Sequence, residues 1–102
     1  MNIPEHLRYT EEHEWLEALE DGTIRIGITD YAQDQLGDVV FLELPSPGTE
    51  FEQGAMVAEV ESTKSVAEVY APLAGTVVAV NERLVDQPDL VNQDPYGEGW
   101  FV

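Results

Sequence analysis

The sequence predicts a small, mostly β protein folded as a sandwich or a barrel. Short runs of β-branched and aromatic residues recur along the chain, and most of them are bounded by Gly, Pro, Asn or Asp, which favour turns. The chain has 102 residues and no cysteine. We therefore expect residues 1–102 to form one domain around one core, without a disulfide framework.

Five segments carry the strand pattern. The first alternates in polarity after the turn pair Asp21-Gly22, and the second stops at the turn sequence Pro45-Ser46-Pro47-Gly48. The expected strands are 24–28, 39–44, 56–61, 66–71 and 76–80, with 100–102 as a candidate for a last short strand.

One short helix is expected over residues 30–36. Asp30 is a suitable N-cap, Gln33 completes an Asp-x-x-Gln capping box, and Gly37 stands at the C′ position. A turn or a second short helix is expected near residues 88–90.

The two central strands predict a hairpin whose two-residue turn is Thr63-Lys64. In this register the apolar residues fall on one face and the acidic residues on the other, whereas a slip by one residue would expose the apolar face. The expected pairs are Ser62 with Ser65, Glu61 with Val66, Val60 with Ala67, Glu59 with Glu68, Ala58 with Val69 and Val57 with Tyr70.

Lys64 is the only lysine in a chain that has 21 acidic residues. A lone amine at an exposed turn suits covalent attachment of a group by an enzyme that recognises the hairpin. A tolerated turn on a solvated acidic face fits the same residues, although Glu59 opposite Glu68 costs a few tenths of a kcal/mol or more. Spacing alone leaves both interpretations open.

The net charge of −17 argues against nucleic acid and anionic membrane surfaces as partners, and favours proteins with basic patches. No apolar run approaches the roughly 20 residues of a membrane span, and residues 1–6 lack the parts of a secretory signal. We expect a cytoplasmic protein. His6 and His13 lack a suitably spaced third ligand, so no metal site is expected.

Several motifs along the chain, specific in combination, resemble the H protein of the glycine cleavage system. They comprise Arg8-Tyr9-Thr10-Glu11-Glu12-His13-Glu14-Trp15, Ile26-Gly27-Ile28-Thr29-Asp30-Tyr31-Ala32-Gln33 followed by Leu36-Gly37-Asp38-Val39, Leu44-Pro45 with Gly48, Glu61-Ser62-Thr63-Lys64-Ser65, Pro72 with Gly75-Thr76-Val77, and the residues Val80-Asn81, Leu84, Pro88, Leu90, Asn92, Pro95, Tyr96, Gly99 and Trp100. The resemblance runs from about residue 7 to residue 100.

The resemblance implies a barrel-sandwich hybrid, the fold of lipoyl and biotinyl carriers. It implies that Lys64 carries lipoate as an amide, which takes the net charge from −17 to −18, and that Glu61, Ser62, Thr63 and Ser65 form the hairpin recognised by a lipoate ligase or lipoyl transferase. Such a chain is a carrier rather than an enzyme, and we expect a monomer. It takes an aminomethyl group from glycine decarboxylase (P protein) to the aminomethyltransferase (T protein), and dihydrolipoamide dehydrogenase (L protein) reoxidises the arm.

The resemblance also implies a surface cleft that holds the loaded arm, with Glu14 and Glu68 as the acids beside its amine. The family usually continues past Gly99-Trp100 into an acidic helical segment, whereas this sequence stops at Val102. Two alternatives stay open: an H-like protein that relays lipoate to other enzymes, and an unmodified acidic interaction domain. A biotinyl carrier is disfavoured, because methionines normally flank that lysine and here Thr63 and Ser65 do.

Overall fold

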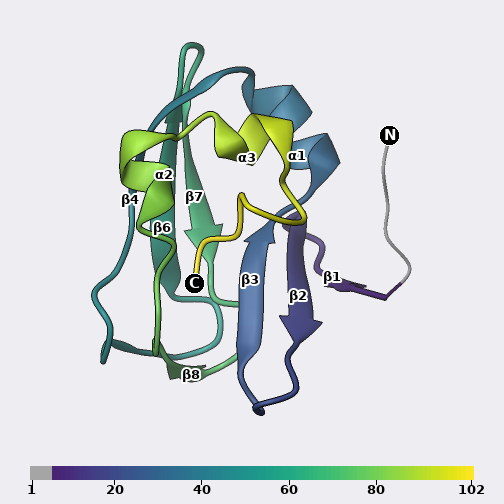
Figure 1. Cartoon of the computed structure of the whole chain (residues 1–102), viewed down its shortest axis with the longest axis vertical. Helices are drawn as coiled ribbons and strands as arrows, with labels where there is room; N and C mark the ends of the chain where they lie inside the picture. The colour runs from purple at the N-terminus through teal and green to yellow at the C-terminus, as the bar shows by residue number, and fades with distance from the viewer. Residues whose placement is uncertain (1–5) are drawn as a thin grey trace.

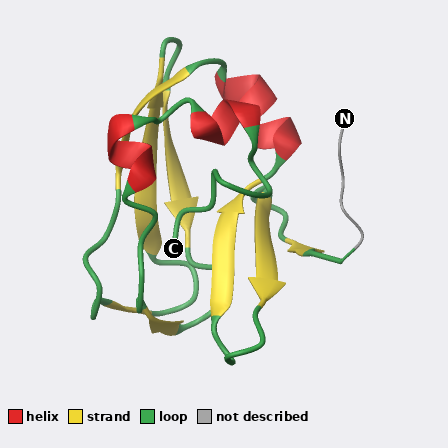
Figure 2. Cartoon of the chain, in the orientation of Figure 1, coloured by secondary structure: helices red, strands yellow, loops and turns green. Residues whose placement is uncertain are grey.

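Two antiparallel three-stranded sheets enclose the core, as Figures 1 and 2 show. The computed structural model describes residues 6–102; residues 1–5, part of the segment in which no secretory signal is expected, lie outside the described residues. One sheet has the order β1-β2-β3 and the other the order β4-β6-β7, while β5 and β8 form a small two-stranded sheet. The strands are β1 (Arg8–Tyr9), β2 (Glu14–Ala18), β3 (Ile24–Ile28), β4 (Val39–Glu43), β5 (Glu50–Phe51), β6 (Met56–Ser62), β7 (Val66–Tyr70) and β8 (Gly75–Thr76).

Three short helices lie between and beside the sheets: α1 (Asp30–Leu36), α2 (Arg83–Asp86) and α3 (Leu90–Gln93). Helix α1 has the predicted bounds, and α3 confirms the short helix expected near residue 90. Helix α2 was not expected, because it is a single four-residue turn without a side-chain cap. Helix α3 packs against α1 at the same end of the molecule as the turn between β6 and β7 (Figure 1).

The predicted N-cap of α1 is wrong by one residue. Thr29, not Asp30, is the cap, and its Oγ1 accepts a hydrogen bond from the amide of Ala32 at 3.2 Å. Asp30 is the first helical residue, and the Gln33 side chain donates to its carboxylate at 2.8 Å. The helix ends at the predicted glycine, but Gly37 is the C-cap rather than C′: its amide closes the helix on the Gln33 carbonyl at a φ of 81°.

The strand expected over 76–80 ends after Thr76. Beyond it only Val77 continues the pairing: its amide donates to the Thr49 carbonyl at 2.8 Å, and its carbonyl accepts from Gly48 at 2.7 Å. The next two residues are exposed. The candidate strand at 100–102 is not a regular strand either, but Phe101 and Val102 lie along β3, where each exchanges a backbone hydrogen bond with Ile26.

The core lies between the two larger sheets and is closed by the C-terminal helices. Trp15 is fully buried, and its indole N–H donates to the Pro95 carbonyl at 2.9 Å, so the tryptophan ties β2 to the C-terminal part of the chain. The main cluster of buried residues comprises Ile28, Val39, Leu42, Val57, Ala58, Val60, Val69, Ala71, Leu84, Val91 and Phe101.

Candidate functional site

The β6–β7 hairpin forms in the predicted register. Glu61 pairs with Val66, Val60 with Ala67, Glu59 with Glu68 and Ala58 with Val69, and the Ser62 amide donates to the Ser65 carbonyl at 2.8 Å. The last expected pair is wrong, because a bulge places Met56 rather than Val57 opposite Tyr70. The bulge turns Val57 into the core, where it is buried.

The turn that carries Lys64 is organised by the Ser62 side chain. Its Oγ accepts hydrogen bonds from the amides of Lys64 at 3.2 Å and Ser65 at 3.1 Å. Neither turn residue has the positive φ of a type I′ turn, since His13 is the only non-glycine residue with a positive φ among those described. The Thr63 amide donates to the Asp38 carbonyl at 3.0 Å, which fixes the hairpin tip to the start of β4. Lys64 itself is exposed.

A cleft of about 350 Å³ opens where α1 faces β7, and we refer to it as the α1 cleft. Its walls come from α1, the end of β3, β6, β7, and the start of β2 with the two residues before it, and it holds both acids that the sequence predicts for an arm-holding site. The apolar lining is Ile28, Ala32, Leu36, Val60, Ala67 and Val69, and the polar and aromatic lining is Glu12, His13, Glu14, Tyr31, Gln35 and Glu68.

Glu14 is a buried carboxylate in this cleft, with 2% of its surface exposed. One carboxylate oxygen accepts from the Tyr70 amide at 2.7 Å, and the other accepts from the Thr10 hydroxyl at 3.1 Å. Burial raises the pKa of Glu14; these two hydrogen bonds oppose the rise, and the nearby charge of Glu12 adds to it. Glu14 therefore joins the N-terminal sheet to β7 while presenting an acid to the cleft.

Glu68 is exposed at the other side of the cleft, and its carboxylate accepts from the Tyr70 hydroxyl at 3.0 Å. Across the sheet it pairs with Glu59, which in turn pairs with Glu43 of β4. The pKa of Glu59 is raised, first by a hydrogen bond with Glu43 and then by desolvation. The negative charges of Glu43, Glu68 and Glu61 raise it further. The predicted repulsion between Glu59 and Glu68 is therefore part of a row of three acids.

The sequence did not identify three partners of this site. Glu43 could have been found by pairing β4 with β6, because the acidic face continues across that pair. The backbone of Tyr70, which binds Glu14 across 56 residues, left no local signal. The same holds for Asn92, whose side chain accepts a hydrogen bond from the Val39 amide and donates one to the Gly37 carbonyl beside the hairpin.

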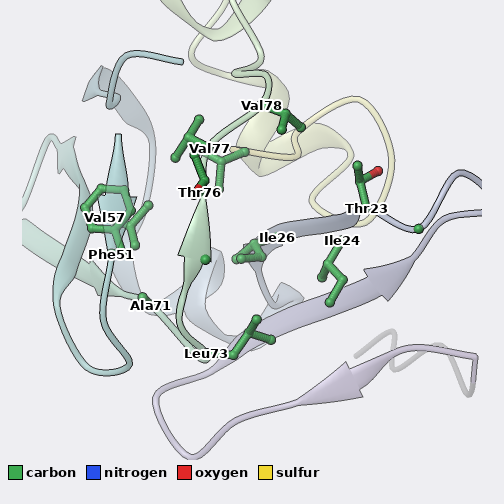
Figure 3. Close-up of a pocket in the computed structure, with 13 residues that line it drawn as sticks. Thr23, Ile24, Ile26, Phe51, Val57, Ala71, Leu73, Thr76, Val77 and Val78 are labelled. Atoms are coloured by element: carbon green, nitrogen blue, oxygen red, sulfur yellow. The ribbon is translucent and has the colours of Figure 1, made fainter. Parts of the chain in front are cut away.

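A second cavity, of about 260 Å³, is lined mainly by apolar side chains, and none of its lining side chains is charged (Figure 3). It lies around β8, at the opposite end of the molecule from the β6–β7 turn (Figure 1). Figure 3 shows that Ile24, Ile26, Leu73 and Val77 contribute to its walls. It is separate from the lysine site.

Within residues 6–102, no group of three or more potential ligands is placed to hold a metal ion. The His13 ring instead lies against the Tyr31 ring in a tilted arrangement, with centroids 4.7 Å apart and planes at 47°, and His6 Nε2 lies 3.7 Å from Glu17 Oε2. In the same part of the chain, no helix is both long enough and apolar enough to cross a membrane.

Comparison with known proteins identifies the family. The family model described as "Glycine cleavage H-protein" matches residues 7–102. The glycine cleavage system H protein of Mycobacteroides abscessus is 59% identical over 100 residues, which are 98% of this chain and 76% of that protein. That of Coprothermobacter proteolyticus is 52% identical over 102 residues, which are all of this chain and 80% of that protein.

A solved structure supports the same assignment. The crystal structure of a glycine cleavage system H protein from Mycobacterium marinum has a TM-score of 0.91 and 44% identity to this chain, covering 97% of this chain and 82% of that one. The mostly β structure is thus the barrel-sandwich fold of lipoyl carriers. The chain belongs to the glycine cleavage H-protein family, whose members are the lipoyl carriers of the glycine cleavage system.

Proposed function

We propose that Lys64 is the residue to which lipoate is attached, as an amide on its side-chain nitrogen. The observation that carries this proposal is that the single lysine of the chain is exposed at the tip of a hairpin whose turn is held by five hydrogen bonds. A primary amine on a fixed, protruding turn is accessible to a modifying enzyme, and no second lysine competes for the same enzyme.

The residues around Lys64 present it to a lipoate ligase or lipoyl transferase. Ser62 shapes the turn, the Thr63 backbone anchors it, and Glu61 and Ser65 flank it as exposed groups. A modifying enzyme would bind a turn whose backbone is already ordered, with Glu61 on the strand before the lysine. Because the turn is ordered before binding, less conformational entropy is lost on recognition.

The α1 cleft suits the attached group and its cargo. Its apolar floor of Ile28, Ala32 and Leu36 fits the hydrocarbon part of a lipoyl arm. When attached, the lipoyl disulfide supplies the sulfur that takes up the aminomethyl group. Glu14 and Glu68 then hold the cationic amine of that cargo between two carboxylates, which relieves the repulsion along the acidic row.

The chain acts in this proposal as a monomeric, single-domain carrier over residues 1–102 that works in the cytoplasm. Glycine decarboxylase loads it, the aminomethyltransferase unloads it, and dihydrolipoamide dehydrogenase reoxidises it. One tethered group visits several active sites without being released. The tether keeps its local concentration at each active site high, so the group itself does not need a high affinity for any of them. Apart from the amide that Lys64 forms with lipoate, no side chain of the carrier reacts.

Attachment is tested by intact mass after incubation with lipoate, ATP and a lipoate–protein ligase. We expect a mass increase of one lipoyl group in the wild type and none in Lys64→Arg. Loading is then tested by glycine–bicarbonate exchange with the decarboxylase. A lipoylated protein that supports no exchange would contradict the glycine-cleavage assignment and favour a relay of lipoate.

The cleft is tested on the loaded carrier. Replacing both cleft acids, Glu14→Gln with Glu68→Gln, should speed loss of the aminomethyl group about tenfold or more while leaving attachment to Lys64 intact. The matched control is Glu50→Gln with Glu52→Gln, which removes the same two charges from exposed positions elsewhere. Equal decay in the two double variants would show that only net charge matters.

A further inference from the structure

The side chain of Lys64 lies along the backbone of Gly37, where α1 ends. A Cβ atom added to Gly37 would stand 3.3 Å from Lys64 Cε, 3.6 Å from Cδ and 3.8 Å from Cγ. The last carbons of the lysine stem therefore run over the bare α-carbon of this glycine. Gly37 has φ 81° and ψ −159°, a conformation essentially restricted to glycine.

Asn92 of α3 holds Gly37 in place. Its side-chain amide donates to the Gly37 carbonyl at 2.8 Å and to Gln33 Oε1 at 3.0 Å, and its Oδ1 accepts from the Val39 amide at 2.8 Å. The Gly37 amide donates to the Gln33 carbonyl. Because the next residue, Asp38, binds the Thr63 amide, residues 37–39 join α3, α1 and the hairpin tip.

The same end of α1 leads into the α1 cleft. Leu36 precedes Gly37 directly, and Ala32 lies one helical turn earlier, so the two occupy one face of the helix. Both line the cleft, as does Ala67 on the hairpin beside Lys64. Gly37 thus lies between the anchor lysine and the cleft that is proposed to receive the attached group.

We propose that Gly37, fixed by Asn92, is a positioning residue for Lys64: its bare α-carbon is the surface along which the lysine stem leaves the hairpin toward the α1 cleft. The direction given to the attached group rests on the proposed function, whereas the contact between the unmodified stem and Gly37 does not. A side chain at position 37 would lift the stem away from α1 and toward solvent.

The experiment compares three variants by proton NMR, first unmodified and then with lipoate attached by a lipoate–protein ligase. Gly37→Ala adds the obstructing methyl group. Gly22→Ala is the matched control, because Gly22 also has a positive φ, 90°, but nothing lies within 4 Å of the added methyl. Asn92→Asp keeps an acceptor for Val39 and removes the donor to Gly37.

In the unmodified wild type we expect nuclear Overhauser contacts between the Lys64 ε-protons and the Gly37 α-protons. In the lipoylated wild type we expect contacts from the dithiolane ring to Leu36 and Ala32. Gly37→Ala and Asn92→Asp should lower the equilibrium constant for docking, and with it the docked fraction; the constant falls about fourfold, the change that burial of about one methylene group supplies. Gly22→Ala should leave it unchanged.

Three results would overturn the proposal: no Lys64–Gly37 contact in the unmodified wild type, an unchanged docked fraction in Gly37→Ala, or an equal loss in Gly22→Ala. A lipoylated wild type without contacts to Leu36 or Ala32 would overturn the guidance toward the cleft. Attachment, which mass spectrometry reads separately, would stand in that case. All spectra are recorded well below the unfolding temperature of each variant, so that the contacts compared between variants are those of the folded state.

Discussion

Position 27 tolerates no side chain, because the ring of Trp15 lies against its α-carbon. A Cβ atom there would stand 2.7 Å from three atoms of that ring. The ring is fully buried and held by its hydrogen bond to Pro95, so moving it aside would disturb the surrounding packing and that bond. The two residues face each other across β2 and β3.

We therefore expect Gly27→Ala to lower the free energy of unfolding by about 2–3 kcal/mol through overpacking. The measurement is the urea midpoint at an unchanged m value. Gly75→Ala is the control, since it also places alanine in a strand but meets nothing within 4 Å. A Gly27→Ala protein as stable as Gly75→Ala would contradict the packing argument.

Sequence predicts which residues sit at the site better than what each of them does. Lys64 could be singled out from composition and placed on a turn from the hairpin register. Glu14 appears in the sequence as one acid among 21, and its burial depends on Tyr70, far along the chain. The error at Thr29 and Asp30 has a local cause, because two good capping residues stand side by side.

At the scale of elements, the β6–β7 hairpin shows how much of the strand pairing a period-2 pattern of side chains predicts. Alternation fixes four cross-strand pairs correctly and fails at the bulge, where Val57 shifts to the core. A bulge adds one residue to one strand, and the apolar residues before and after it still alternate. The sequence pattern alone therefore does not show where the bulge lies. The strand expected over 76–80 fails for a related reason: the side chains suit a strand, but only Val77 finds backbone partners beyond β8.

The hairpin tip depends on the Ser62 side chain, and this dependence can be measured. Ser62→Ala removes the acceptor for the Lys64 and Ser65 amides. We expect hydrogen exchange at these two amides to rise about tenfold, and lipoylation by a ligase to slow, while overall stability falls by only about 1 kcal/mol.

Ser65→Ala serves as the control for this prediction. It keeps the Ser65 amide and carbonyl that bind Ser62, and it changes only an exposed side chain. If exchange at the Lys64 amide rises equally in both variants, the turn is held by the strands and not by the serine.

At the scale of the whole molecule, two carboxylates, Glu14 and Glu59, make the folded state less stable at neutral pH than in acid. The pKa values of Glu14 and Glu59 are raised, so the folded state binds their protons more tightly than the unfolded chain does. Their contribution to stability is complete below the ordinary value of about 4.5 and is lost as the pH rises through the raised values. Asp21, whose pKa is lowered by its bonds to Thr23, acts in the opposite direction.

Stability should therefore rise as the pH falls from neutral toward about 4.5, the ordinary value from which both pKa values are raised, measured by urea unfolding. Glu14→Gln should lose part of this gain, whereas Glu50→Gln, which removes one exposed charge, should keep it. Repeating both titrations in about 0.5 M NaCl separates the causes, because salt screens the net charge of −17 but not the desolvation of Glu14. Identical slopes for the two variants would assign the effect to net charge alone.

Because Lys64 is the only lysine of the chain, its modification can also be measured by proteolysis. The four basic residues of the chain are Arg8, Arg25, Lys64 and Arg83, and trypsin cleaves after such residues. Acylation of the lysine abolishes one of these cuts, so peptides 26–64 and 65–83 are replaced by a single peptide 26–83. A digest of protein taken directly from cells therefore reports the occupancy of the carrier as a ratio of peptides, without an antibody or an added reagent.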